Sequence, residues 1–332
     1  MSLALARSGW AKIVLRGTAR EHLLIDGPQP EPSAMTERAT WSGVVGELFR
    51  YPVKSMQGER VGGLAVGPGG VVGDRALALL DLSTGHVASA HHPQKWGALL
   101  HCAARWEGDP DAGGSIVVTL PDGGEEAAGP RLERLLSDLL GRRVALIRKA
   151  PAGGAYEIVH PDIEGVAPDA FVEQTLEAAG VRHGRVGRLD LGLDAPAGAL
   201  VDVSPVHLVA ASSLLALQTA SEPVDLRRFR PNLVFEGPGS GYVEAAWTGA
   251  HVAAGQVLLA VSMPTPRCAV TTLEQRGVPA DSGPLRRLAA QNRIDMGGGG
   301  WACFGSYATV VRPGPIALGD PVTIVGPHAN AR

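Results

Sequence analysis

Residues 263–272, Met-Pro-Thr-Pro-Arg-Cys-Ala-Val-Thr-Thr, are the stretch around which the rest of this 332-residue chain is organised. They place Cys268 directly after Arg267, between a predicted strand at 256–262 and a polar Thr-Thr pair. A neighbouring guanidinium lowers the pKa of a thiol and favours the thiolate, which is the form that attacks or binds metals. Free cysteine is also among the most buried residue types, so composition alone favours a structural core cysteine. The other motifs of the chain have to decide between these readings.

Length and composition exclude several classes of protein. A chain of 332 residues with 45% hydrophobic content forms one large or two ordinary domains with a sizeable core. Lys+Arg 30 against Asp+Glu 33 leaves a net charge of -3, too balanced to predict nucleic acid or a membrane surface as the main partner. The three cysteines form no CxxC pair and are too few for a disulfide framework. No apolar run approaches the roughly 20 residues of a membrane-spanning helix. We therefore expect a cytoplasmic protein without stable membrane insertion.

Residues 1–40 are predicted to be a disordered extension. Four basic residues precede the first acid, Glu21, a pattern that superficially resembles a basic presequence or an amphipathic anchor. A second methionine, Met35, follows a proline-rich stretch and is a candidate for the true start. Residues 1–25 lack the uninterrupted apolar stretch of a signal peptide.

Residues 41–150 are predicted to form a β-rich N-terminal domain, because short apolar runs alternate with glycine turns. A single helix is expected at 130–141, opened by Pro130 and closed by Gly141, with leucines at helical spacing that pack into the core. The predicted strands are 44–51, 61–66, 75–81 and 115–120.

Residues 151–200 are rich in Gly, Ala and Pro and are predicted to connect the two domains, with a short helix at 169–179. Residues 201–328 then alternate short strands with few helices, which favours a second, barrel-like β domain. Its helices are expected from Ser204-Pro205 through Gln218 and at 284–292, and its strands at 232–235, 256–262, 307–311 and 322–325.

Three further motifs carry cationic side chains suited to an anionic ligand. Arg227-Arg228-Phe229-Arg230-Pro231-Asn232 brings three arginines and an amide together, although a solvated turn balanced by Asp225 is the alternative. Lys54 and Ser55 follow a predicted strand end. The pair Asp74 and Arg75 follows a glycine turn and is equally compatible with a surface ion pair.

Taken together, the motifs resemble the MOSC domain family, named after the C-terminal domain of molybdenum cofactor sulfurase, and most resemble the branch that contains the mitochondrial amidoxime reducing component. The similarity runs from about Gly43 to Val325. It implies a mainly β fold with peripheral helices (α+β), in which a smaller β-rich MOSC N-terminal domain precedes a MOSC β-barrel. The motifs are Tyr51-Pro52-Val53-Lys54-Ser55-Met56, Gly73-Asp74-Arg75, Phe229-Arg230-Pro231-Asn232, Arg267-Cys268 with Thr271-Thr272, and the run 313–320 with the pattern Pro-Gly-x-Ile-x-x-Gly-Asp.

The resemblance implies a molybdenum cofactor, a molybdopterin whose dithiolene binds the metal and whose phosphate must be anchored. Cys268 would be the catalytic residue and the protein thiolate ligand to molybdenum. One position departs from the branch, where a small polar residue precedes the Arg-Cys pair, because Pro266 has no backbone N–H to donate. This departure leaves the substrate open. The residues implied to hold the cofactor are Lys54, Ser55, Arg75, Ser213, Arg230, Asn232, Arg267 and Tyr307.

The implied activity is reduction of N-hydroxylated or related oxygenated small molecules by oxygen transfer to molybdenum. The chain carries no flavin, haem or iron–sulfur signature, so electrons would come from a separate electron-transfer protein that holds such a group. Two alternatives stay open. The first is a sulfur transferase with a persulfide on Cys268, and the second is a non-catalytic cofactor carrier. Both also follow from the MOSC resemblance.

Overall fold

The structure is a computed structural model, and it describes residues 39–180, 185–219 and 222–326. The predicted extension lies almost entirely outside the described residues, as does the candidate start at Met35. Among the described residues, no helix combines the length and apolar character needed to cross a bilayer.

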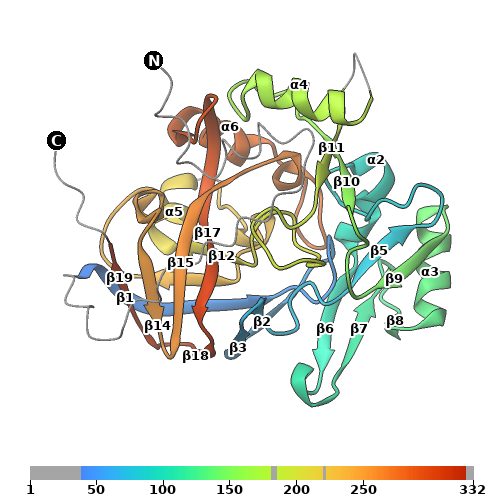
Figure 1. The fold of residues 1–332 in the computed structure, drawn as a ribbon, viewed down its shortest axis with the longest axis horizontal. Helices are drawn as coiled ribbons and strands as arrows, with labels where there is room; N and C mark the ends of the chain where they lie inside the picture. The colour runs from blue at the N-terminus through green and yellow to red at the C-terminus, as the bar shows by residue number, and fades with distance from the viewer. Residues whose placement is uncertain (1–38, 181–184, 220–221, 327–332) are drawn as a thin grey trace.

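Seven strands close into a barrel in the order β12-β13-β1-β19-β14-β15-β17, and β12 pairs back onto β17 (Figure 1). The β12–β13 pair is parallel and the other pairs are antiparallel. Closure leaves no unpaired sheet edge among these strands. The barrel strands are β1 (Ala39–Arg50), β12 (Val206–Ala210), β13 (Leu233–Glu236), β14 (His251–Ala254), β15 (Val257–Pro266), β17 (Gly300–Arg312) and β19 (Pro321–Val325).

The barrel encloses a core of aliphatic and aromatic side chains, in which Leu48, Leu208, Phe235, Leu259 and Ile324 are fully buried. Strand residues alternate between faces, so each strand of the barrel points every second side chain inward. The predicted fold class is confirmed: the chain is mainly β, with a closed barrel, smaller sheets and, among the described residues, five α-helices.

Smaller sheets pack beside the barrel. Strand β2 (Glu59–Val61) pairs with β1, and β18 (Gly314–Ala317) joins β3 (Gly63–Gly67) and β4 (Gly70–Val71). A second core lies between β5 (Ala78–Asp81) with β9 (Val144–Ile147) and the sheet β6 (Ala103–Glu107), β7 (Ser115–Thr119) and β8 (Glu125–Ala127). Helices α2 (Pro93–Trp96) and α3 (Pro130–Leu140) border that core, and α3 confirms the predicted helix.

The segment between the two cores has structure of its own. Strands β10 (Ala155–Val159) and β11 (Val186–Asp190) form an antiparallel pair, and α4 (Asp169–Ala178) packs beside β11, close to the predicted short helix. Figure 1 shows this segment arching over the region between barrel and smaller sheets. The predicted connection thus includes a lid-like layer with its own strand pair and helix.

One predicted element is wrong. The expected helix from Ser204 through Gln218 is a buried strand, β12, followed by a short helix, α5 (Ala211–Leu217). All five residues of β12 are buried, so their apolar run has no polar face to reveal a strand period. Barrel closure onto β17 requires a strand at this place and overrides the helix propensity of the sequence.

The remaining elements border the barrel. Helix α6 (Gly283–Gln291) matches the predicted helix at 284–292, and β16 (Arg293–Asp295) pairs with the start of β17. Strand β1 lies in the predicted N-terminal range 41–150 except for its first two residues, yet it pairs with β13 and β19 of the barrel. The two predicted domains therefore share a continuous strand, and this strand ends at the site described next.

Candidate functional site

A cavity of about 490 Å³ opens between the barrel, the smaller sheets and the segment that carries β10, β11 and α4. Eight of the nine predicted site residues line it, although they come from five separate parts of the sequence. The barrel and the N-terminal sheets thus contribute to one site. These eight are Lys54, Ser55, Arg75, Arg230, Asn232, Arg267, Cys268 and Tyr307.

Three residues of the cavity wall adopt a left-handed backbone. Ser55 (φ 68°), Arg75 (φ 43°) and Arg230 (φ 54°) are the non-glycine residues with positive φ in the described part of the chain. Such a conformation costs on the order of 1–3 kcal/mol per residue and persists only where surrounding structure imposes it. Three such residues in one cavity indicate that the directions of their side chains are maintained there at a cost in local stability.

Tyr51 explains how two of these strained residues are aimed. Its buried ring contacts two guanidinium groups, with Arg75 Cζ 4.7 Å and Arg230 Cζ 4.4 Å from the ring centroid. Arg230 Nη1 also donates to Met56 O at 2.6 Å. Burial, and then the neighbouring Arg75, lower the pKa of Arg230 to about 10. Stacking on one ring therefore holds two like charges together in a buried place.

The Gly-Asp-Arg motif is tied to the Tyr-Pro-Val-Lys motif through Asp74. Its carboxylate accepts from Tyr51 N at 2.7 Å and pairs with Arg75. The Asp74 side chain is 3% exposed, so the alternative of a surface ion pair is wrong. Gly73 is required in this turn, because its φ is 78° and a Cβ would lie 2.7 Å from Trp106 Nε1.

Lys54, which is buried, forms an ion pair with Asp202, whose side chain is 33% exposed. Burial lowers the pKa of Lys54, and Asp202 offsets this only in part. Burial raises the pKa of Asp202, but Lys54, His91 and Arg75 together hold it at about 2. Asp202 is thus an anion in a cationic cavity. It lies just after the predicted connection 151–200 and belongs to none of the motifs that the sequence offered.

Cys268 lies where β15 ends and a 3-10 turn (Ala269–Thr272) begins, and its side chain is partly accessible. Burial raises its thiol pKa, but the charge and hydrogen bond of His91, followed by Arg267, outweigh this and lower it. Cys102 and Cys303 differ, because burial raises the pKa of each to about 12. Among the three cysteines, Cys268 alone has an environment that favours the thiolate.

His91, like Asp202, is a site residue that sequence reasoning missed. Its Nδ1 lies 2.8 Å from Ser89 Oγ, and its ring is 5.2 Å from that of Tyr156, which also lines the cavity. Burial lowers the pKa of His91, whereas Cys268 and Asp202 raise it, with a net upward shift. The sequence pointed to Arg267 as the neighbour that lowers the thiol pKa, but His91, from a distant loop, lowers it more.

Two predicted site residues, Asn232 and Ser213, direct their polar atoms to hydrogen bonds within the fold rather than into the cavity. Asn232 lines the cavity wall, but its Oδ1 accepts from His207 N at 3.1 Å and its Nδ2 donates to Phe49 O at 3.4 Å. Ser213 does not line the cavity: it is fully buried in α5 and hydrogen-bonds to the Glu244 carboxyl. The sequence placed this hydroxyl on a longer helix, and the shorter α5 turns it toward Glu244 instead.

We predict that Glu244→Gln stabilises the protein at pH 8. Burial raises the pKa of Glu244 to about 7, against hydrogen bonds from Ser213 and Gly305 N. The stability that its protonated form contributes is fully present below the ordinary carboxyl pKa of about 4.3 and lost as pH rises through 7. Glutamine mimics the protonated form, so urea unfolding should show a gain on the order of 2 kcal/mol at pH 8 and none near pH 4. Equal stability of both proteins at pH 8 would contradict this.

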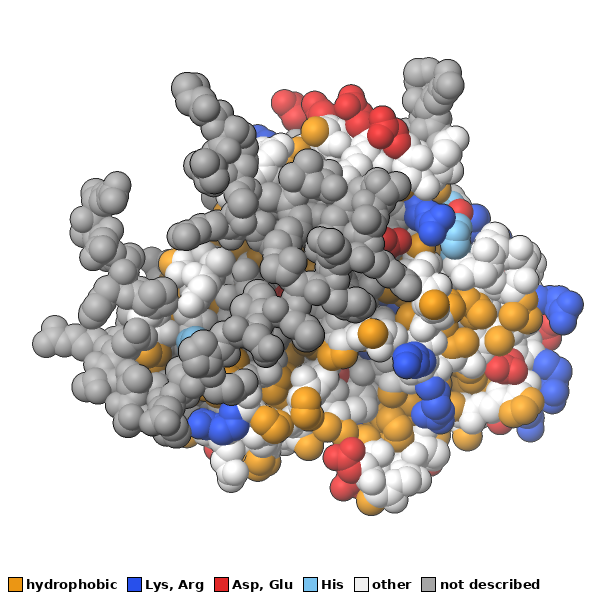
Figure 2. All heavy atoms as spheres, viewed as in Figure 1, with side chains coloured by type: hydrophobic (Ala, Val, Ile, Leu, Met, Phe, Trp, Pro, Cys, Tyr) orange, Lys and Arg blue, Asp and Glu red, His pale blue; other side chains and the backbone are white. Residues whose placement is uncertain are grey.

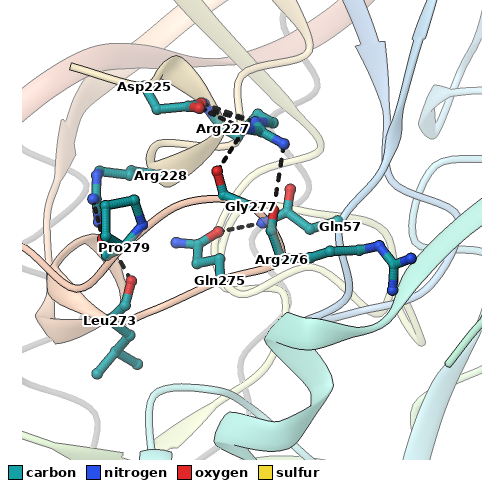
Figure 3. Close-up of polar contacts among 9 residues, drawn as sticks. All are labelled: Gln57, Asp225, Arg227, Arg228, Leu273, Gln275, Arg276, Gly277 and Pro279. Atoms are coloured by element: carbon teal, nitrogen blue, oxygen red, sulfur yellow. Dashed lines mark hydrogen bonds and ion pairs between the residues drawn. The ribbon is translucent and has the colours of Figure 1, made fainter. Parts of the chain in front are cut away.

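The segment after Cys268 is fastened from two sides, as Figure 3 shows. Arg228, which is 3% exposed, donates to the carbonyls of Thr271 (3.2 Å), Leu273 (3.3 Å) and Pro279. Gln57, from the smaller sheets, donates to Gln275 Oε1. The loop that carries the cysteine is thereby held against both parts of the molecule.

Arg227 and Arg276 complete this fastening. Arg227 pairs with Asp225 at 2.6 Å and donates to the carbonyls of Arg276 and Gly277, each at 3.4 Å (Figure 3). Arg276 Nη1 donates to Leu120 O at 3.0 Å. Of the three clustered arginines, only Arg230 lines the cavity, so the expected convergence of all three on a ligand is wrong.

We predict a large stability difference between two neighbouring substitutions. Arg228→Met removes a buried donor from three backbone carbonyls and should cost about 2–4 kcal/mol. Arg227→Met removes a side chain that is 43% exposed and should cost less than about 1 kcal/mol. Urea unfolding of both variants measures the contrast, and equal costs would show that the buried arginine does not hold the loop.

Comparison with known proteins agrees with this architecture. Residues 42–133 match the MOSC N-terminal beta barrel domain, and residues 196–323 match the MOSC domain. Mitochondrial amidoxime-reducing component 1 is 34% identical in Mus musculus and 33% in Homo sapiens, each over 131 residues that make up 38% of this chain and 38% of the relative. The matched region thus spans well under half the length of either protein.

Two solved structures show lower similarity. The YuaD protein from Bacillus subtilis aligns with a TM-score of 0.38 and 10% identity over 85% of this chain and 95% of that one. YiiM from Geobacillus stearothermophilus aligns with a TM-score of 0.27 and 18% identity over 39% and 57%. From its two matched domains and its closed barrel, this chain belongs to the MOSC domain family, with a MOSC N-terminal beta barrel domain preceding the MOSC domain.

Proposed function

We propose that this protein is a molybdenum-cofactor-dependent oxidoreductase that reduces N-hydroxylated or related oxygenated small molecules. The observation that carries the proposal is one cavity that brings the buried Lys54 and two strained arginines, Arg75 and Arg230, together with a cysteine whose pKa is lowered. MOSC domains are associated with the molybdenum cofactor. The partial similarity to amidoxime-reducing components supports the reaction class.

The residues of the cavity fit such a cofactor. Arg230 Nη2 and Arg267 Nε are buried without a hydrogen-bond partner among the described residues, and both side chains line the cavity. Donors left unpaired in a buried cationic site suit an anionic ligand such as a phosphate. Cys268 supplies one soft donor, and the described residues hold no group of three or more His, Cys, Asp or Glu arranged for a metal ion.

Each residue then has a definable role. Lys54, Ser55, Arg75 and Arg230 would hold the phosphate and pterin, and the Cys268 thiolate would bind the metal. When bound, the cofactor would supply the two-electron chemistry that removes oxygen from the substrate. Ser89 orients His91 against Cys268, and the fastened loop keeps the thiolate in place.

The proposed reaction balances with an external electron donor. An amidoxime takes up two electrons and two protons, its N–O bond breaks, nitrogen is reduced, and an amidine and water leave. The electrons come from a separate protein that carries flavin, haem or iron–sulfur, since none of the motifs for these groups occurs in the sequence.

A second candidate function is sulfur transfer through a persulfide on Cys268. It is favoured by the same lowered thiol pKa and by the partial accessibility of the side chain, because an attacking thiolate needs both. A cofactor carrier without turnover would share the cavity but not the reaction.

Metal and pterin analysis of the purified protein, combined with a benzamidoxime reduction assay using a chemical electron donor, separates these functions. About one molybdenum per chain with turnover supports the reductase. Metal-free protein with labile sulfane sulfur on Cys268 supports sulfur transfer. Molybdopterin without turnover under any reductant supports a carrier.

A further inference from the structure

The cavity is lined by side chains of two kinds. Lys54, Arg75, Arg230 and Arg267 come from the barrel and the smaller sheets, and the part of the cavity that they line is named here the cationic end. Ile158, His160, Phe171 and Leu189 come from the segment that carries β10, β11 and α4, and Trp301 of β17 contacts Phe171. A cofactor held at the cationic end leaves the part lined by this second set, named here the outer chamber, for something else.

The wall of the outer chamber is apolar and rigid. The Phe171 and Trp301 rings meet edge to face with centroids 4.5 Å apart, and Phe171 meets His160 at 6.0 Å and 89°. His160 Nε2 lies 2.6 Å from Thr175 Oγ1, and burial, followed by His91, lowers its pKa to about 4. His160 is therefore neutral near pH 7, and the aromatic wall carries no formal charge. Such a wall suits a flat, apolar ring.

The mouth of the outer chamber is acidic. Asp162, Glu164 and Asp169 line it and are exposed, and within the described part of the chain only Asp162 forms an ion pair, with Arg185 at 2.9 Å. Figure 2 shows acidic side chains gathered at the edge of the molecule where Figure 1 places α4. A rim with excess negative charge lowers the local concentration of anions and raises that of cations. The rim therefore opposes anions that the cationic end would attract.

We propose that the outer chamber is the substrate site and selects neutral or cationic N-hydroxylated compounds that carry a flat apolar ring, with Phe171 and Glu164 as specificity-determining residues. This inference rests on the proposed function for the reaction, but the ligand preference stands on the chamber itself. The chemistry of the wall selects the ring, and the charge of the rim excludes carboxylated analogues.

Three probes test the proposal on the full-length protein loaded with its cofactor: benzamidoxime, acetamidoxime and 4-carboxybenzamidoxime. Binding is measured by calorimetry and turnover is measured separately. Wild-type protein should bind benzamidoxime at least about 10-fold more tightly than either other probe. Equal affinity for all three would overturn the proposal even if turnover is fast.

Two pairs of variants assign the residues. Phe171→Ala should weaken benzamidoxime binding about 10-fold and leave acetamidoxime within about 2-fold, while Phe171→Leu, which keeps an apolar filling, should lose less. Glu164→Lys should strengthen 4-carboxybenzamidoxime binding several-fold at low salt, and Glu177→Lys on α4, which is exposed and outside the cavity, should not. Because Glu164 is exposed, its substitution does not threaten folding.

The outcomes separate the two proposals. Selective binding without reduction of any probe overturns the proposed reaction and keeps the substrate site. Reduction with no preference for ring or charge keeps the reaction and overturns the substrate site. An identical effect of Glu164→Lys and Glu177→Lys shows that total charge, rather than the rim, governs affinity.

Discussion

Cys268→Ser is expected to lower benzamidoxime reduction by at least about 100-fold while leaving the fold intact. Serine keeps the volume of the side chain, but its hydroxyl stays protonated near pH 7 and is a poor ligand for a soft metal site. The backbone bonds that build the following turn, such as Thr271 N to Cys268 O at 3.3 Å, do not involve the sulfur atom. Turnover and bound molybdenum are the measurements, with urea unfolding as the check on folding.

Cys102→Ala is the matched control for this experiment. Cys102 is fully buried in the second core, outside the cavity, and burial raises its pKa to about 12. Its loss should cost some stability through a small void and leave turnover unchanged. A Cys268→Ser protein that reduces benzamidoxime at the wild-type rate would eliminate the reductase mechanism proposed above.

Arg230→Met should weaken cofactor binding without substantially lowering the stability of the cofactor-free protein. Loss of a charge-assisted hydrogen bond to an anion costs about 1.5–3 kcal/mol, which predicts a 10- to 150-fold weaker hold on the cofactor. Without cofactor, however, Arg230 lies beside Arg75, and burial and this like charge lower its pKa to about 10. Methionine removes both costs but also gives up the bond to Met56 O and the contact with the Tyr51 ring, so the cofactor-free variant should match the stability of the wild type to within about 1 kcal/mol.

Molybdenum content after gel filtration and urea unfolding of cofactor-free protein measure the two quantities. Arg50→Met is the control, because Arg50 pairs with Glu59 at 2.8 Å and lies outside the cavity. A structural arginine would lower stability and leave cofactor content unchanged. That result for Arg230 would contradict an anion site in this cavity.

Motif order predicted most of the site because its residues lie in short segments with recognisable chemistry. Arg75, Arg230 and Cys268 each stand beside a turn or strand end, where backbone geometry frees a side chain from the core. The prediction that Ser213 lines the cavity was wrong, because the sequence does not indicate which way a hydroxyl in the middle of a helix faces. The prediction that Arg227 and Arg228 join Arg230 at a ligand was wrong. Identical side chains in one motif bind different groups, and only the packing of the folded chain decides which group each one binds.

The fold shows the same division. Glycine turns and short apolar runs predicted a mainly β chain, and Pro130 with Gly141 predicted α3. Strand β12 escaped prediction because a strand buried on both faces loses the alternation that identifies it. The membership of β1 in the barrel depends on pairing with strands far along the chain, which local pattern does not encode.

By itself the sequence determined the fold class, the cationic side chains of the cavity and the cysteine, because these depend on residue type and local turn chemistry. Only the tertiary structure decided what lowers the pKa of Cys268 and what orients the arginines. His91 reaches the thiol from a distant loop, and Tyr51 stacks two guanidiniums that the sequence lists far apart. Coulombic and stacking energies depend on distance in space, and closing the barrel onto the smaller sheets sets those distances.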